Sequence, residues 1–358
     1  MNSSHPSPRH KHRFIVLDSF RGLCALSVVV FHLHLLQGFS EWDFFRSAGL
    51  MVEFFFTLSG FVLAYRYGEE PIDGDGFRRY MISRFFRIYP LHLVMLLLFS
   101  GAMFWGGFTA SQWQQWLYQI LLLQAWLPSA DPFGFNGPAW SISVEFYLYV
   151  LFGAILWATL RWRQVAFALV VAACTLCALL AFNFSQSGGF RGITCFFLGA
   201  LAYRGFDAIH QQRISFKWAT LIEVLLLGAL YIVITAQYPM KSFWAAWAFA
   251  LVIVLFAFEQ GGISKLLRHP WCVSMGKWSF SIYLTHYALL HLIQAGLTAF
   301  APQALQPKDG LNFISFGSAL ADNAAGLAIL ALVLLISRFS YQQIELRGVR
   351  WGKKLLSA

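Results

Sequence analysis

The first apolar segment of the chain, residues 14–37, carries side chains that can move protons. They are Asp18, Arg21 and His32, and ionisable groups inside a membrane span are costly and are functional candidates by default. Eleven residues of helix make close to three turns, so Arg21 and His32 share a face and are about 16 Å apart along the axis. Asp18 lies one turn before Arg21, whereas His34 is rotated by about 200° from His32. We therefore expect His32, and not His34, to act with Arg21.

Two kinds of chemistry are open to His32. A histidine changes charge near neutral pH, so it can act as a general base toward a hydroxyl group. It can also attack an electrophile itself as a nucleophile, and the sequence does not separate the two roles. There are two alternatives to a catalytic role of His32. It could be a structural histidine held by a neighbouring helix, or part of a proton relay in a transporter.

The composition places these groups in a membrane protein. Of 358 residues, 58% are hydrophobic and 12% charged, whereas soluble domains have about 25% charged residues. Apolar stretches of about 15 to 25 residues recur along the chain, which predicts helical spans and an all-α fold. The longest polar stretch, predicted as a cytoplasmic loop at 66–88, is too short to form a soluble domain of its own.

The arrangement of apolar and basic segments predicts ten transmembrane helices with both termini cytoplasmic. The predicted spans are 14–37, 46–65, 89–107, 138–160, 164–184, 190–205, 217–236, 241–258, 274–298 and 319–340. With 113–127 not crossing, nearly all basic residues of the loops fall on the cytoplasmic side, as the positive-inside rule requires. We interpret 113–127, which carries Trp113, Trp116 and Trp126, as an interfacial or re-entrant helix outside.

The chain is accordingly predicted to consist of a cytoplasmic tail at 1–13, a membrane domain at 14–340 and a second cytoplasmic tail at 341–358. Its net charge of +10 suits the anionic inner leaflet of a lipid bilayer and requires no nucleic-acid partner. The sequence contains no zinc-type histidine pair on a helix, no glycine-rich phosphate loop and no G-x-S-x-G motif. We therefore predict no metal cofactor.

Further motifs follow the first span in a fixed order. They are F-F-F-T-L-S-G-F at 54–61 preceded by Glu53, R-F-F-R-I-Y-P at 84–90, W-S-I-S-V-E at 140–145, S-F-S-I-Y-L-T-H at 279–286 and F-S-Y-Q-Q-I-E at 339–345. In this order, and with the spacing from Arg21 to His32, the chain resembles the acyltransferase-3 family of integral-membrane O-acyltransferases over nearly its whole length. It resembles the stand-alone form of that family, of the kind that O-acetylates exopolysaccharide or lipopolysaccharide.

The resemblance implies a ten-helix fold and an acyl-CoA donor, acetyl-CoA or another, used from the cytoplasmic side. It also implies transfer of the acyl group to a hydroxyl of a carbohydrate or a lipid-linked carbohydrate in a bacterial inner membrane. The family's functional residues fall on Arg21 and His32, on Arg84 and Arg87, on Ser59 and on Glu145. Many relatives have a second glutamate after this last one, where the present chain has Phe146.

Each assignment has a physical rationale and a structural alternative. Guanidinium groups suit phosphate oxygens, so we expect Arg84 and Arg87 to bind the coenzyme with Arg21; the alternative is the ordinary basic cluster of a cytoplasmic loop. Ser59 either handles the acyl donor or, with the glycine after it, marks close helix packing. Glu145 is expected near the outer end of its span, where it orients the hydroxyl or relays a proton to His32, or else only pairs helices.

The function predicted from the sequence is therefore a membrane O-acyltransferase that moves an acyl group, most readily acetyl, from acyl-CoA to a cell-surface or exported polysaccharide or its precursor. A proton-coupled transporter or flippase is the alternative. The pair Arg84 and Arg87 separates the two, because a proton relay does not require it. The length of the acyl group and the acceptor hydroxyl stay open.

Overall fold

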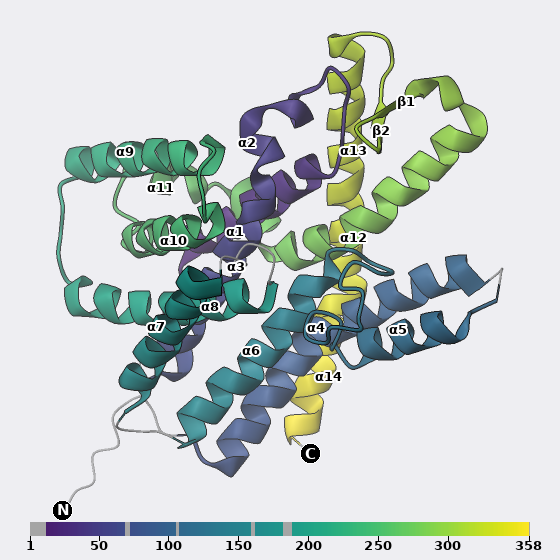
Figure 1. Cartoon of the computed structure of the whole chain (residues 1–358). Coiled ribbons are helices and arrows are strands. Elements are labelled where there is room, and N and C mark those ends of the chain that lie inside the picture. Colours follow the sequence, from purple (N-terminus) through teal and green to yellow (C-terminus); the bar gives the residue numbers. More distant parts are fainter. Residues whose placement is uncertain (1–11, 69–71, 105–106, 159–161, 182–187, 358) are drawn as a thin grey trace, which may run out of the picture.

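The computed structural model describes residues 12–68, 72–104, 107–158, 162–181 and 188–357, which are mainly helical (Figure 1). The α-helices are α1 (Ile15–Phe31), α2 (Asp43–Arg46), α3 (Met51–Tyr67), α4 (Gly74–Phe104), α5 (Ala110–Ile120), α6 (Ala139–Ala158), α7 (Arg163–Ala181), α8 (Gly188–Ile209), α9 (Phe216–Thr235), α10 (Lys241–Ala257), α11 (Gly262–Leu267), α12 (Pro270–Phe300), α13 (Ala319–Ser340) and α14 (Leu346–Ser357). Short 3₁₀ turns lie at Phe39–Glu41, Ala48–Leu50 and Pro302–Ala304, and a π-helical turn, η4 (Tyr341–Glu345), joins α13 to α14.

A small antiparallel hairpin interrupts the helical fold between α12 and α13. Its strands are β1 (Leu305–Lys308) and β2 (Leu311–Ile314), with Leu305 opposite Ile314. Ile314 also exchanges backbone hydrogen bonds with the segment after α1, since its N–H donates to the carbonyl of His34. The hairpin therefore fastens the end of α1 to the α12–α13 connection, at the top of Figure 1.

Each of the ten predicted spans coincides with a helix: α1, α3, α4, α6 to α10, α12 and α13. Six segments of the described residues are long and apolar enough to cross a membrane, namely Ala48–Tyr67, Gly74–Gly101, Ala139–Ala158, Gly188–Ile209, Phe216–Thr235 and Ala319–Ser357. Arg163–Leu176 and Lys241–Ala257 are apolar but shorter. The chain is thus an all-α membrane protein, and the count of ten crossings stays a prediction.

Three boundaries differ from the sequence prediction. The first helix ends at Phe31 and not at 37, because His34 takes a positive φ of 43°. Helix α4, which contains the third predicted span, begins at Gly74, so most of the loop predicted at 66–88 is helical. The segment predicted as a cytoplasmic tail, 341–358, is helical in its described residues, and its place outside the membrane stays a prediction. Apolar windows miss such polar helical turns, because their hydrophobic periodicity ends where a helix borders a polar cavity.

Helix α5 agrees with the prediction that 113–127 does not cross the membrane. Its 11 residues span about 16 Å, about half the thickness of a bilayer core. Trp116 fixes it against α4, because its indole N–H donates to Ser100 Oγ at 2.9 Å. A capping box formed by Thr109 and Gln112 starts the helix at its other end.

Two glycine pairs bring the central helices into backbone contact. A Cβ on Gly60 of α3 would lie 1.8 Å from the carbonyl oxygen of Phe196 in α8, and one on Gly199 of α8 would lie 1.9 Å from that of Thr57. Where α1 crosses α12, a Cβ on Gly276 would lie 2.2 Å from the carbonyl oxygen of Asp18. Small residues allow such close crossings, which are a main source of helix association within membranes.

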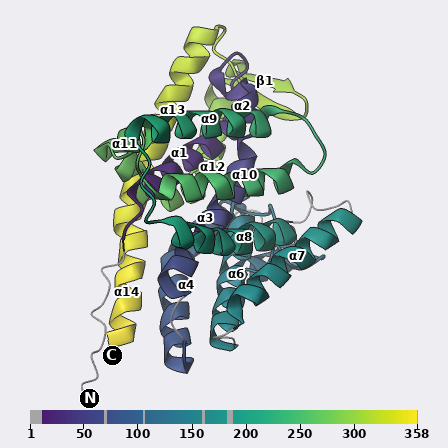
Figure 2. The same ribbon diagram turned by 90° about the vertical axis from the view of Figure 1, so that its left-hand side faces the viewer.

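Helices α13, η4 and α14 form one long rod that runs from the top to the bottom of the molecule in Figures 1 and 2. Its lower half packs on α4, where Gly348 and Gly352 face Phe86 and the helix-interior Pro90. This contact places η4 next to the arginines of α4. The start of α1 lines the same cavity as η4 and the start of α14.

Candidate active site

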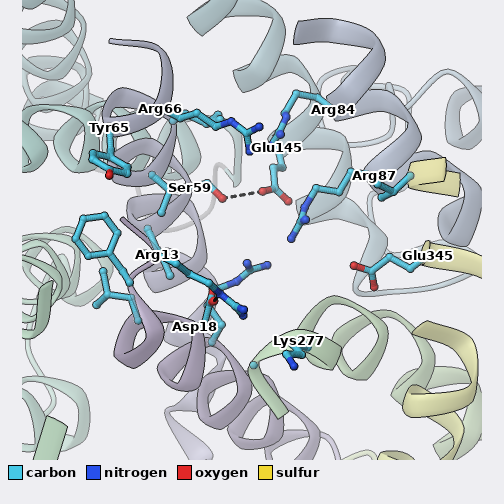
Figure 3. A pocket seen from close by; sticks show the side chains of 18 of the residues that line it. Arg13, Asp18, Ser59, Tyr65, Arg66, Arg84, Arg87, Glu145, Lys277 and Glu345 are labelled. Carbon is cyan, nitrogen blue, oxygen red and sulfur yellow. Dashed lines mark hydrogen bonds and ion pairs between the residues drawn. The ribbon is translucent and has the colours of Figure 1, made fainter. Parts of the chain in front are cut away.

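A basic cavity of about 600 Å³ lies among α1, α3, α4, α6, α12 and the η4–α14 segment. Six arginine and lysine side chains line it against three carboxylates, and Figure 3 shows most of them converging on its centre. The basic residues are Arg13, Arg21, Arg66, Arg84, Arg87 and Lys277, and the acidic ones are Asp18, Glu145 and Glu345. We call this space the basic cavity. Its volume is within the range of small-molecule sites, and its excess of positive charge suits an anionic ligand.

Arg21 and Arg87 line the basic cavity near the carboxylates of Asp18, Glu145 and Glu345, but no described residue makes a hydrogen bond or an ion pair within 4 Å with either guanidinium. Arg84 is held differently, because its guanidinium lies over the ring of Tyr149 at 5.9 Å from the centroid. Guanidinium groups are donors only, and planar forks of this kind match phosphate oxygens.

Glu145 accepts two hydrogen bonds at the inner end of the basic cavity. Ser59 Oγ donates to its Oε1 at 2.8 Å, the contact drawn in Figure 3, and the hydroxyl of Tyr149 donates to the same oxygen. Glu145 therefore lines a polar cavity, as predicted. The crossing of α3, α4 and α6 brings it to the same cavity as Arg84 and Arg87, and its place near the outer end of its span stays a prediction.

The motifs at 17–22 and 54–61 each combine a packing residue with a site residue. Gly22 and Gly60 sit at the close helix crossings, and the residues directly before them, Arg21 and Ser59, line the basic cavity. The glycine of the motif at 54–61 packs against α8, as the packing interpretation predicts, and its serine faces the basic cavity. A role of Ser59 toward the acyl donor stays a prediction.

A side pocket of about 40 Å³ extends the basic cavity into the molecule. The two spaces share Arg21, Ser59 and Glu145. The remaining walls are mostly apolar and come from α3, α6 and α12: Val52, Phe55, Phe56, Ser141, Ile142, Ser279, Phe280 and Tyr283. Tyr283 is one of these walls, and its hydroxyl is fixed because it accepts from Ser141 Oγ at 2.9 Å and donates to the Pro138 carbonyl at 3.2 Å.

His32 lies beyond the side pocket, paired with a second histidine. His32 Nδ1 is 2.9 Å from the carbonyl of Val28 and 3.3 Å from Nε2 of His286, whose Nδ1 is 3.3 Å from the carbonyl of Ile282. Carbonyls only accept, so both rings are assigned as Nδ1–H tautomers, with His32 donating to Val28 and His286. This assignment leaves the lone pair of His32 Nε2 available as a base.

The ring of His286 links His32 to the side pocket. Its centroid is 5.1 Å from that of His32 and 6.0 Å from that of Tyr283. Neither histidine lines the basic cavity or the side pocket. Arg21 therefore lies in the first half of α1 and His32 at its C-terminal cap, and the contacts that connect them pass through α12.

His34 is engaged elsewhere, as the prediction that favoured His32 requires. Arg46 Nη1 donates to His34 Nδ1 at 2.8 Å, and Arg46 also donates to the carbonyl of Phe31 at the end of α1. Burial and the adjacent Arg46 guanidinium lower the pKa of His34 to about 4, so it is neutral near pH 7. Arg46 thereby anchors the helix end that carries His32.

The structure brings together five of the six predicted site residues: Arg21, Ser59, Arg84, Arg87 and Glu145 share the basic cavity, and His32 lies beyond it. Sequence reasoning gave no site role to Tyr149, and it treated Glu345 as a residue of helix pairing alone. Glu345 is 4% exposed, lines the basic cavity and accepts from Ser281 Oγ at 3.2 Å. Glu345 lies in a π-helical turn, a feature common at functional sites that only the structure reveals.

Among the described residues, no group of three or more histidine, cysteine, aspartate or glutamate side chains is placed to hold a metal ion.

Comparison with known proteins finds relatives over most of the chain. A protein-family model described as "Acyltransferase domain" matches residues 14–338. The chain is 27% identical over 381 residues to acyltransferase MdmB of Streptomyces mycarofaciens, covering 93% of this chain and 92% of that protein. It is 27% identical over 158 residues to an O-acetyl transferase of Shigella phage Sf6, covering 40% of this chain and 46% of the relative. No solved structure matches significantly.

Proposed function

The chain belongs to the acyltransferase-3 family, and on that premise we propose that it moves an acetyl group from acetyl-CoA to a carbohydrate hydroxyl. The acceptor is a cell-surface or exported polysaccharide or its lipid-linked precursor. The observation that carries the proposal is the pair Arg21 and Arg87, two guanidiniums that line the basic cavity without a close protein partner among the described residues. The phosphates of a coenzyme A thioester would supply the partners that these groups lack.

The orientation in the membrane follows from the same proposal. We place the protein in a bacterial inner membrane, with ten crossings and both termini in the cytoplasm. The start of α1, the end of α3 and helix α14 border the basic cavity, which then opens toward the cytoplasm, where acyl-CoA is made. His32 and the α12–α13 hairpin lie toward the opposite face, from which an exported acceptor would approach.

In the proposed reaction, His32 acts as the general base. Its Nε2 takes the proton of the acceptor hydroxyl as the oxygen bonds to the thioester carbonyl carbon. The carbon–sulfur bond breaks and coenzyme A leaves as a thiolate, which the protonated imidazole can neutralise. The carbonyl of Val28 and Nε2 of His286 hold the Nδ1–H tautomer that this role requires.

The transferase is tested by incubating membranes that contain the protein with acetyl-CoA labelled in the acetyl group and an envelope carbohydrate fraction. We expect coenzyme A release together with label in carbohydrate, and loss of both in His32→Ala at equal expression. His210→Ala is the matched control, because His210 is exposed at the end of α8 and contacts Asp207. Labelling that persists in His32→Ala would remove His32 from the chemistry. Absence of labelling with every acceptor fraction would favour transport.

A further inference from the structure

The side pocket has a size and a position that bear on which acyl group is transferred. We propose that it receives the acyl group of the donor and admits acetyl but not chains of four or more carbons. This inference rests on the proposed acyl-CoA donor, and in it the side chains of Phe55, Ile142 and Tyr283 limit the length of the acyl group.

The position of the side pocket makes it the inner end of the donor site. It shares Arg21, Ser59 and Glu145 with the basic cavity, so a donor whose phosphates meet the arginines can extend into it. One of its walls is Tyr283, whose ring centroid is 6.0 Å from that of His286, the partner of His32. Among the described walls of the two spaces, this is where a thioester would come nearest to the base.

The volume of the side pocket matches a very small group. A cavity needs about 10–15 Å³ of this volume to hold one water molecule, so 40 Å³ accommodates roughly three non-hydrogen atoms. An acetyl group has that many, whereas a butyryl group adds two methylenes. Ser59 and Glu145 form the polar side of the entrance, and the remaining walls are mostly apolar, as an acyl chain requires.

The walls have little freedom to retreat before a longer chain. Phe55 packs edge-on against Tyr283 with ring centroids 5.8 Å apart. Hydrogen bonds to Ser141 and Pro138 fix the Tyr283 hydroxyl, and Ile142 is only 2% exposed. Closely packed interiors of this kind resist the insertion of single methylene groups. A hydrophobic pocket distinguishes substrates by about 10-fold or more per methylene, so two methylenes give about 100-fold.

The test measures kcat/KM for acetyl-, propionyl- and butyryl-CoA with the full-length protein in membranes and one carbohydrate acceptor. We expect butyryl-CoA to be used about 100-fold less well than acetyl-CoA. Ile142→Ala removes side-chain volume from the pocket wall and should raise the butyryl-to-acetyl ratio about 10-fold or more. Leu148→Ala is the matched control, because Leu148 is equally buried on α6 but does not line the pocket.

The outcomes separate the inference from the proposed function. Wild-type activity with butyryl-CoA within about threefold of that with acetyl-CoA would overturn the inference and leave the transferase intact. An equal change of the ratio in Ile142→Ala and Leu148→Ala would also overturn it. Phe55→Leu repeats the test if Ile142→Ala does not fold. If none of the three thioesters is consumed, the acyl-CoA donor itself is wrong.

Discussion

His286 has a defined and limited contribution if it positions His32 and does not take part in the chemistry. The Nδ1–H of His32 is shared between the Val28 carbonyl at 2.9 Å and His286 Nε2 at 3.3 Å. His286→Ala removes the longer of the two contacts and leaves the shorter, which still selects the tautomer. One neutral hydrogen bond contributes about 0.5–1.5 kcal/mol, so kcat should fall about three- to tenfold.

The loss in His32→Ala should be much larger, because general base catalysis contributes about 10²- to 10⁴-fold. The double variant should be no worse than His32→Ala alone, since two residues that act as one unit are not additive. His286→Gln should recover part of the activity, because its amide oxygen can accept from His32 near the position of the lost nitrogen. The KM for the donor should stay unchanged in His286→Ala, because His286 lines neither donor space.

The assay is the initial rate of coenzyme A release in membranes, with expression and thermal stability measured for every variant. Thr285→Ala is the matched control, since Thr285 is a buried neighbour on α12 whose hydroxyl contacts Ser281 and Ser337. The reasoning is refuted if His286→Ala loses as much activity as His32→Ala, which would make His286 the base. It is equally refuted if His286→Gln is no better than His286→Ala.

Three further predictions concern the basic cavity and the helix crossings. Arg87→Ala should raise the KM for acyl-CoA about 10-fold and change kcat little, because its guanidinium has no close protein partner among the described residues; steady-state kinetics with an unchanged KM would contradict this. Glu345→Gln should lower that KM about two- to fivefold by removing a buried negative charge facing the donor phosphates, and a higher KM would count against the assignment. Gly60→Ala should destabilise the protein by about 3 kcal/mol or more, because its Cβ would meet a backbone oxygen. Thermal melting in detergent, with Gly228→Ala as the control that meets open space, checks the last prediction.

The sequence determined the elements and the residue types of this protein. Each of the ten predicted spans coincides with a helix, because a bilayer requires continuous apolar segments whose backbone groups bond within the segment. The spacing of Arg21 and His32 predicted their separation along α1, since helix geometry is local, but only Arg21 lines the basic cavity. The family of the chain was also readable from the order of its motifs, and comparison with known proteins confirms it.

The tertiary structure decided which of these residues meet. Glu145 lines the same cavity as the arginines, and Glu345 reaches that cavity from a π-helical turn. His286 contacts His32 across 254 residues of sequence. Which of these side chains come into contact depends on how each helix is rotated and at what angle it crosses its neighbours. Backbone contacts at the glycines of α1, α3, α8 and α12 fix the rotation and the crossing angle. A period of apolar residues defines a helix, but only the fit of one helix surface against another determines where its polar residues point.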